Sequence, residues 1–201
     1  MRRIILHMMI SLDGFVAPRD GTESWMTSPD PDREAASLAL VHEVDTAMAG
    51  HGVYADMVAY WPGAQGGTAT QRDYIDRVNA MPKLIVSRRP AELSWNNASS
   101  FVSTSEADLV NRIRALKRGP GRDIVFWGGA DIAQQFARLD LIDEYQLMVQ
   151  PIVLGGGEAL FAGLDHWTTF RLVACRPVES GAVLMTYAPA DGGADRGGGH
   201  E

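Results

Sequence analysis

The sequence predicts an α/β fold, in which a mixed, mainly parallel sheet lies between two layers of helices and ends in an antiparallel hairpin. Short runs rich in Ile, Val, Leu and Met alternate with helical patterns over the first two thirds of the chain. Continuous apolar runs of this kind are typical of strands that are covered on both faces. The last third instead contains two strand patterns around a turn, so the sheet is expected to have an antiparallel edge.

Several segments are predicted as strands, the first four of them in the parallel part of the sheet. These four apolar runs cover residues 4–10, 44–49, 84–86 and 124–127. Strand patterns follow at residues 144–152, 169–174 and 182–187. The Glu179-Ser180-Gly181 segment between the last two is typical of a hairpin turn, so these strands are expected to pair with each other.

Three helices are predicted from their boundary residues. Asp30 supplies a capping acid, and Pro31 is an early proline of the first turn. Two acids in that turn interact favourably with the positive end of the helix dipole, so a helix is expected to about residue 42. Ser105 with Asp108 resembles a capping arrangement, and an apolar stripe then runs to a Gly-Pro-Gly end at residues 119–121. A short third helix is expected between residues 130 and 140.

Composition and charge exclude several classes of protein. A chain of 201 residues with 46% hydrophobic content suits one domain, predicted over residues 1–189, followed by a flexible glycine-rich tail over residues 190–201. The formal net charge of −7 leaves no broad basic field, so nucleic acid is not an expected partner. No apolar stretch approaches the roughly 20 residues that span a bilayer, and no secretory cleavage pattern is present, so a cytoplasmic protein is expected.

The reactive side chains form no recognisable site by their spacing alone. Cys175 is the single cysteine and lies in an apolar run, so it is expected to be a small buried hydrophobe rather than a reactive thiol. The five histidines have no metal-ligand spacing, and no metal site is predicted. Nothing in the sequence resembles the nucleophile elbow of a hydrolase.

The strongest local motif is IVFWGGA at residues 124–130, a buried strand that leads through two glycines into a helix. Without side chains at Gly128 and Gly129 the backbone can approach a ligand closely, and the unpaired amides of a helix start favour negative charge. The motif therefore predicts a phosphate site. A tight strand-to-helix turn that binds nothing is the alternative, because a glycine pair is less specific than the full dinucleotide spacing.

Several blocks resemble, in the same order, the motifs of the family formed by dihydrofolate reductase and the reductase domain of riboflavin biosynthesis, especially its small stand-alone bacterial members. The resemblance covers nearly the whole chain and implies a dihydrofolate-reductase-like three-layer α/β/α fold. Its motifs are SLDGFVA at 11–17, ESWMTSP at 23–29, FWGGA at 126–130, LIDEY at 141–145, PIVLGGG at 151–157 and LF at 160–161.

The resemblance implies NADPH as the cofactor. In the family the glycine pair contacts the diphosphate and the nicotinamide side of NADPH, and Gln135 is a weaker candidate for a contact on the adenine side. The residues that match this segment here are Gly128, Gly129, Ala130, Asp131 and Ile132.

A second cofactor segment of the family ends a strand in Gly-Arg-x-Thr-Tyr, and this chain has Gly50-His51-Gly52-Val53-Tyr54 at that place. The sequence therefore departs from the family at two phosphate-holding positions. An imidazole replaces a permanently charged guanidinium, and Val53 has no hydroxyl group to donate. Cofactor affinity or preference is expected to differ as a result.

A third segment, LIVSRR at residues 84–89, resembles the family's stretch near the adenosine 2′-phosphate. Ser87, Arg88 and Arg89 are therefore implied cofactor contacts, and two adjacent guanidinium groups offset the arginine that is missing at position 51. This favours NADPH over NADH, and one of the two arginines is enough. The alternative is a solvated basic turn before Pro90.

Catalytic and substrate contacts are assigned by their order along the chain. In dihydrofolate reductases an acid on the first long helix supplies a proton, and Glu34 is its nearest counterpart, although a first-turn acid also stabilises the helix dipole. The resemblance places Asp13 beside the nicotinamide, where it orders its loop or contacts substrate, and a turn-forming Asp-Gly is the simpler account. Trp25, Thr27 and Ser28 fall where riboflavin reductases meet substrate, although many surface loops have this composition.

The resemblance implies an NADPH-dependent oxidoreductase, similar to dihydrofolate reductase and to 5-amino-6-(5-phosphoribosylamino)uracil reductase. Its substrate is expected to be a small pterin-like or pyrimidine-like heterocycle, or a related carbonyl or imine. The altered segment at residues 50–53 favours an alternative, a non-catalytic nucleotide-binding or regulatory module on the same fold. The resemblance also implies a homodimer that pairs through the C-terminal part of the sheet.

Overall fold

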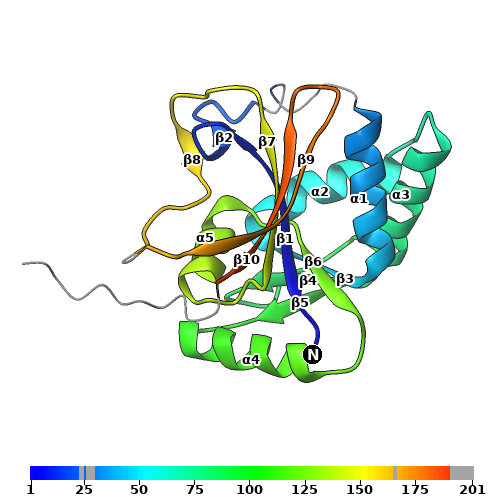
Figure 1. Cartoon of the computed structure of the whole chain (residues 1–201). Helices are drawn as coiled ribbons and strands as arrows, with labels where there is room; N and C mark the ends of the chain where they lie inside the picture. Colours follow the sequence, from blue (N-terminus) through cyan, green and yellow to red (C-terminus); the bar gives the residue numbers. More distant parts are fainter. Residues whose placement is uncertain (23–24, 26–29, 165–166, 191–201) are drawn as a thin grey trace, which may run out of the picture.

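The computed structural model describes residues 1–22, 25, 30–164 and 167–190, and Figure 1 gives their arrangement. Its centre is an eight-stranded sheet, and a smaller antiparallel sheet pairs β2 (Phe15–Pro18) with β8 (Gly157–Ala159). The strands of the large sheet are β1 (Ile4–Ser11), β3 (Val44–Gly50), β4 (Lys83–Ser87), β5 (Ala98–Val102), β6 (Asp123–Phe126), β7 (Glu144–Gln150), β9 (Phe170–Pro177) and β10 (Val183–Pro189).

The strand order of the large sheet is β5-β4-β3-β6-β1-β7-β10-β9. Every neighbouring pair from β5 to β7 is parallel, whereas β10 is antiparallel to both β7 and β9. The predicted mixed, mainly parallel sheet with an antiparallel hairpin is confirmed. The strands β4, β3 and β6 are neighbours and run parallel, so their carboxyl ends lie side by side at one end of the sheet.

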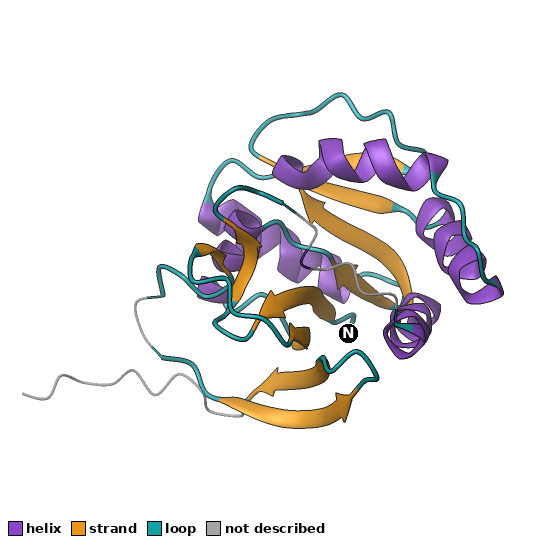
Figure 2. Cartoon of the chain, turned by 90° about the horizontal axis from the view of Figure 1, so that it is seen from above, coloured by secondary structure: helices purple, strands orange, loops and turns teal. Residues whose placement is uncertain are grey.

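Helices cover both faces of this sheet, and Figure 2 shows strands running between them. They are α1 (Pro31–Glu43), α2 (Tyr54–Tyr60), α3 (Ala69–Ala80), α4 (Glu106–Arg118) and α5 (Ala130–Arg138), with short 3-10 turns at η2 (His51–Val53) and η3 (Trp61–Gly63). Among the described residues, no helix combines the length and the apolar character that crossing a membrane requires.

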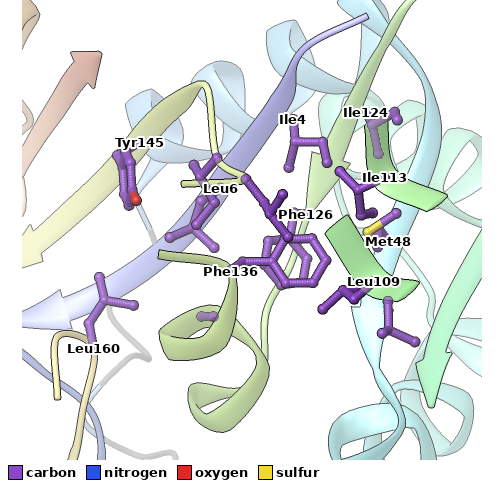
Figure 3. Packing of buried hydrophobic residues seen from close by; sticks show 14 of the residues in the cluster. Ile4, Leu6, Met48, Leu109, Ile113, Ile124, Phe126, Phe136, Tyr145 and Leu160 are labelled. Atoms are coloured by element: carbon purple, nitrogen blue, oxygen red, sulfur yellow. The ribbon is translucent and has the colours of Figure 1, made fainter. Parts of the chain in front are cut away.

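The core consists of two apolar layers, one on each face of the sheet. On one face, Leu109 and Ile113 of α4 and Phe136 of α5 are buried against the strands, and the rings of Phe126 and Phe136 lie 4.6 Å apart (Figure 3). The layer on the opposite face has a buried residue from each of three helices: Leu40 of α1, Tyr54 of α2 and Val78 of α3. Burial on both faces explains why the central strands are continuous apolar runs.

The helix starts that the sequence predicts are confirmed by their caps. The Asp30 carboxylate accepts from the amides of Asp32 and Arg33 at 2.9 and 3.0 Å. The Ser105 hydroxyl accepts from the Asp108 amide at 3.2 Å. These bonds satisfy amides that have no partner inside the helix. Five of the described strands and α-helices were not predicted from the sequence: β2, α2, α3, β5 and β8.

The β9–β10 hairpin forms the predicted antiparallel edge. Gly181, with a φ of +85°, closes its turn by donating to the Val178 carbonyl at 3.0 Å. Cys175 is exposed, so the expectation that it is buried is wrong. The reason is its position, because β9 is the last strand of the sheet and its apolar run, including Leu172 at 51% and Val173 at 49% exposure, faces outward.

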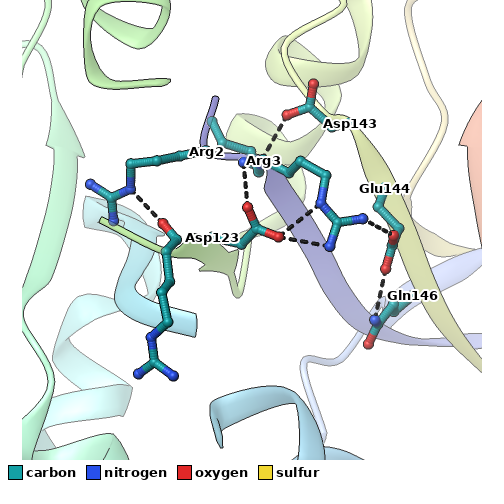
Figure 4. Close-up of polar contacts among 8 residues, drawn as sticks. Arg2, Arg3, Asp123, Asp143, Glu144 and Gln146 are labelled. Carbon is teal, nitrogen blue, oxygen red and sulfur yellow. Dashed lines mark hydrogen bonds and ion pairs between the residues drawn. The ribbon is translucent and has the colours of Figure 1, made fainter. Parts of the chain in front are cut away.

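Charged side chains join the amino ends of the three central strands (Figure 4). Arg3 of β1 forms ion pairs of 2.7 Å with Asp123 of β6 and with Glu144 of β7. The Ile4 amide donates to the Asp143 carboxylate at 2.7 Å. This network lies at the sheet edge opposite the carboxyl ends and fixes the register of β1 between its two neighbours.

Candidate functional site

A cleft of about 1130 Å³ lies where the carboxyl ends of three neighbouring parallel strands meet. We call it the carboxyl-edge cleft. It is lined by residues that follow β3, by Ser87 and Arg88 at the end of β4, and by the turn that joins β6 to α5. Ligands of open α/β sheets bind outside the carboxyl ends of strands, because helix starts and loops converge there. The fold therefore provides a binding site at this edge.

Two glycines allow the strand ends to approach each other closely. The Gly50 amide donates to the Gly128 carbonyl at 2.8 Å, which joins the end of β3 to the turn after β6. A Cβ atom at Gly50 would lie 2.6 Å from Cγ2 of Ile132. A side chain at position 50 would therefore push α5 away from β3, and glycine is required there by packing.

The β6–α5 turn presents the main chain of Gly129 to the cleft. Gly128 and Gly129 have φ angles of +71° and +90°, which L-residues rarely adopt. Gly129 caps α5 without a side chain, and the first bond of the helix runs from the Ala133 amide to the Gly129 carbonyl at 3.0 Å. The amides of residues 130–132 precede that bond, so they have no carbonyl partner inside the helix and lie at the positive end of its dipole.

The cleft gathers most of the residues that the sequence analysis assigned to a cofactor. Gly128 is covered from the cleft by Met8, whose Sδ atom lies 2.6 Å from the position of a Cβ at this glycine. Arg88 lines the cleft, whereas Arg89 does not, and the Arg89 carbonyl instead accepts from the Ser87 hydroxyl at 2.6 Å. The assigned residues that line the cleft are Gly50, His51, Gly52, Val53, Ser87, Arg88, Gly129, Ala130, Asp131, Ile132 and Gln135.

A second cavity of about 400 Å³ adjoins the cleft. Trp61, Tyr74 and Trp127 form its aromatic walls, and we call it the aromatic cavity. The two spaces share the side chains that line both of them: Met8, Val16, Val53 and Trp127. A molecule in the cleft and a molecule in the aromatic cavity would therefore meet at this common wall.

Glu34 lies in the aromatic cavity, as expected for a residue of the first helix that faces a ligand. Its Oε1 atom accepts from the Gln71 side-chain amide at 2.7 Å. Gln71 also closes the capping box of α3. Its side-chain Oε1 atom accepts from the Thr68 backbone amide at 3.2 Å, and its backbone amide donates to the Thr68 hydroxyl at 3.1 Å. The carboxylate is thus held by the start of the neighbouring helix.

Two other titratable groups of the aromatic cavity, His7 and Tyr74, stay neutral near pH 7. Burial lowers the pKa of the His7 imidazole to about 4, and its Nε2 atom lies 3.4 Å from the Ser37 hydroxyl. Burial, with a contribution from Tyr60, raises the pKa of the Tyr74 hydroxyl to about 12. Both shifts follow from the cost of placing a charge in an apolar space.

Asp13 lies outside the lining of both spaces. Its carboxylate accepts from the Ser11 hydroxyl at 2.6 Å and from the amides of Leu154 and Gly155 at 3.1 and 2.8 Å. These hydrogen bonds, that from Ser11 first, lower the pKa of the Asp13 carboxyl. The contacts support the loop-ordering role of Asp13, since they join the β1–β2 loop to the glycine-rich loop before β8.

Of the three proposed substrate contacts, only Trp25 is within the described residues. It lines the carboxyl-edge cleft rather than the aromatic cavity, and its indole Nε1 is buried without a hydrogen-bond partner. Thr27 and Ser28 lie outside the described residues, as does the segment after residue 190 that was expected to be a tail. Within the described part of the chain, no three His, Cys, Asp or Glu side chains gather as a metal cluster.

Sequence reasoning missed most of the aromatic cavity. Trp61 comes from η3 and Tyr74 from α3, two elements that the sequence analysis did not single out, and His7 was considered only as a metal ligand. The available signal was the aromatic pair at residues 60–61 before Pro62-Gly63, close to Tyr74 in the sequence. A pattern of this kind is also common in ordinary cores, so it does not by itself indicate a cavity.

Known proteins share this fold along nearly the whole chain. A Bacillus subtilis (strain 168) protein, YyaP, which is itself uncharacterized, is 31% identical over 186 residues, or 92% of this chain and 94% of YyaP. A Shewanella sp. PV-4 protein assigned by name to riboflavin biosynthesis superposes with a TM-score of 0.72 at 23% identity, covering 94% of this chain and 99% of that one.

A Thermotoga maritima protein is named as a diaminohydroxyphosphoribosylaminopyrimidine deaminase and 5-amino-6-(5-phosphoribosylamino)uracil reductase. Its structure superposes with a TM-score of 0.64 at 15% identity, covering 94% of this chain and 57% of that one. The fold here is therefore that of the riboflavin-pathway reductases. The family model of the RibD C-terminal domain matches residues 2–184, and the chain belongs to this family.

Proposed function

We propose that this protein is an NADPH-dependent reductase, which binds the cofactor in the carboxyl-edge cleft and the substrate in the aromatic cavity. The observation that carries the proposal is the wall common to the two spaces, formed by Met8, Val16, Val53 and Trp127. Hydride transfer needs two rings held in contact and water excluded from between them. Two adjoining spaces whose shared lining is apolar would let the rings meet at the junction and would keep water away from it.

The residues of the cleft fit a dinucleotide phosphate ester. The bare amides at residues 130–132 suit the diphosphate. A side chain at Gly129 would crowd Val53, whose Cγ1 would lie 3.2 Å from the added Cβ. Arg88 lies in the lining and suits the 2′-phosphate of NADPH. NADPH, when bound, would supply the hydride, and the chain supplies binding and orientation.

The substrate side of the reaction needs an acceptor double bond and a proton. In the proposed reaction a C=N or C=O group takes the hydride at carbon, NADPH becomes NADP⁺, and the nitrogen or oxygen takes a proton. Glu34 is the only carboxylate among the described residues that line the aromatic cavity. We assign it the role of holding or passing that proton, with Gln71 fixing its orientation through the 2.7 Å bond.

The cofactor position is tested best at Gly52, because a Cβ added there meets no atom of the chain within 4 Å and the glycine has an ordinary φ. Gly52→Leu is expected to leave the melting temperature of the free protein unchanged and to weaken NADPH binding at least tenfold, as measured by calorimetric titration. Gly63→Leu is the matched control, since Gly63 is equally open and lies outside the cleft lining. Equal NADPH affinity in the two variants would refute the proposed cofactor site.

NADPH oxidation assays then separate the enzyme from the regulatory module that the altered residues 50–53 suggest. A reductase oxidises NADPH in the presence of a conjugated imine or carbonyl compound, whereas a module binds the cofactor without turnover. Failure of both NADPH and NADH to raise the melting temperature at saturating concentration would exclude both functions, because a ligand that binds the native state must stabilise it.

A further inference from the structure

The aromatic cavity has rigid walls. The rings of Trp61 and Trp127 lie 6.5 Å apart between centroids and are nearly parallel, at 17°. Tyr74 meets Trp61 edge to face at 5.6 Å, and the Trp61 carbonyl accepts from the Asn79 side chain at 2.9 Å. Because Trp61 is held by neighbours on two sides, little conformational entropy remains to be lost when a ligand stacks on it.

The electrostatics of the cavity disfavour a strongly anionic ligand. Its described lining carries one formal positive charge, Arg33, and one negative charge, Glu34. His7 adds none, because burial keeps its imidazole neutral near pH 7. The remaining surface is mostly Met, Val and aromatic carbon. A dianion bound here would lose its hydration and face a carboxylate, without a net positive charge in return.

The carboxyl-edge cleft differs in having the start of α5 and the exposed Arg88 in its lining. Its lining also contains Asp56, Asp131 and Glu158, and Arg138 forms an ion pair of 2.6 Å with Glu106. A phosphate there would therefore depend on the main-chain amides of α5 and on Arg88, rather than on a net positive lining. The Thermotoga maritima protein is named for a phosphoribosylated substrate, for which a reductase needs a phosphate site on the substrate side as well.

We propose that the substrate is a flat, conjugated heterocycle without a phosphate group, which stacks against Trp61 and Trp127 in the aromatic cavity. The identification of this ligand as a substrate rests on the proposed function. Its binding preference, however, can be measured without turnover. The proposed substrate differs from the phosphoribosylated compound after which the Thermotoga maritima protein is named.

The test uses a pair of probes that differ only in a phosphate, 4-methylumbelliferone and 4-methylumbelliferyl phosphate, titrated calorimetrically into the protein with and without added NADP⁺. The unphosphorylated compound is expected to bind at least tenfold more tightly. Stronger or equal binding of the phosphate ester would overturn the proposal, and so would the absence of binding by either probe.

The location is tested with two tryptophan variants. Trp61→Ala is expected to weaken binding of 4-methylumbelliferone about tenfold, because stacking of a ring on an aromatic side chain contributes roughly 1–3 kcal/mol. Trp167→Ala is the matched control, since Trp167 is 77% exposed and lies outside both linings. If both variants lost the same affinity for 4-methylumbelliferone, or if neither lost any, the probe would bind elsewhere and the proposal would be overturned.

Failure of this inference can be distinguished from failure of the proposed function. Trp61 does not line the carboxyl-edge cleft, so NADPH affinity is expected to be the same in Trp61→Ala and the wild-type protein. If NADPH binds and the phosphate ester is preferred, the reductase assignment stands and the substrate class is wrong. If 4-methylumbelliferone binds through Trp61 but neither nicotinamide cofactor binds, the cavity is assigned correctly and the reductase assignment falls.

Discussion

The two adjacent arginines after β4 allow a sharp test of cofactor choice, because the structure places only one of them in the cleft. Arg88 lines the carboxyl-edge cleft, and Arg89 does not. Both side chains are exposed and carry the same charge, and both residues lie in the loop before Pro90. Alanine at position 88 should therefore remove a contact with the 2′-phosphate of NADPH, whereas alanine at position 89 should remove only a nearby surface charge.

The expected size of the effect follows from the exposure of Arg88. A hydrogen bond to a charged group contributes about 1.5–3 kcal/mol when sheltered. Solvent around Arg88 screens its charge, so a value of about 1–1.5 kcal/mol is appropriate, which corresponds to roughly a five- to tenfold loss of NADPH affinity. NADH lacks the 2′-phosphate, so its affinity should be unchanged in Arg88→Ala.

Calorimetric titration of both cofactors into Arg88→Ala, Arg89→Ala and the wild-type protein gives the ratio of NADPH to NADH affinity directly. Arg88→Ala should reduce this ratio five- to tenfold and Arg89→Ala less than twofold. The difference between the variants should shrink in high salt, because exposed charges are screened. An unchanged ratio in Arg88→Ala, or a larger change in Arg89→Ala, would refute the assignment of Arg88 to the 2′-phosphate.

Further predictions concern affinity, stability and assembly. His51→Arg should raise NADPH affinity about three- to tenfold by titration, because it adds a permanent charge to the cleft lining. Asp30→Ala should lower the free energy of unfolding at pH 7 by about 1–2 kcal/mol in urea denaturation, through loss of the α1 cap. Leu172→Glu should convert a homodimer to a monomer by light scattering, if a second copy covers the 51% exposed Leu172 on β9 as the family resemblance implies.

The Asp30 prediction includes a pH dependence of defined sign. Burial raises the pKa of the Asp30 carboxyl, but hydrogen bonds from Ser180, Arg33 and Asp32 outweigh it, and the folded pKa lies below its usual value. The stabilisation is therefore complete above the unfolded value of about 3.9 and is lost as the pH falls through the folded pKa. The wild-type protein and Asp30→Ala should accordingly converge in stability at acid pH, and a constant difference would contradict the capping role.

Local patterns were enough to predict the strands β3, β4 and β6 and the helix α5 beside the carboxyl-edge cleft. The central strands are buried on both faces, so their apolar runs are visible in the sequence, and α1 and α4 begin with side chains that cap their own amides. The Gly128-Gly129 turn is likewise a local feature. Cys175 was assigned wrongly because an apolar run does not distinguish a central strand from the edge strand β9, whose exposure depends on its place in the sheet.

The substrate side could not be predicted in the same way, because contacts between distant segments build it. Trp61 meets Trp127 only after η3 packs over the end of β6, and Gln71 reaches Glu34 only when α3 lies beside α1. The groups at the start of α5 that we propose bind phosphate are main-chain amides, which any sequence with suitable glycines supplies. The aromatic cavity, in contrast, is made of side chains from many elements, among them β1, α1, α2, η3 and α3. Substitutions there should change the substrate while leaving cofactor binding intact, so members of one family can share a cofactor cleft and differ in the compound they reduce.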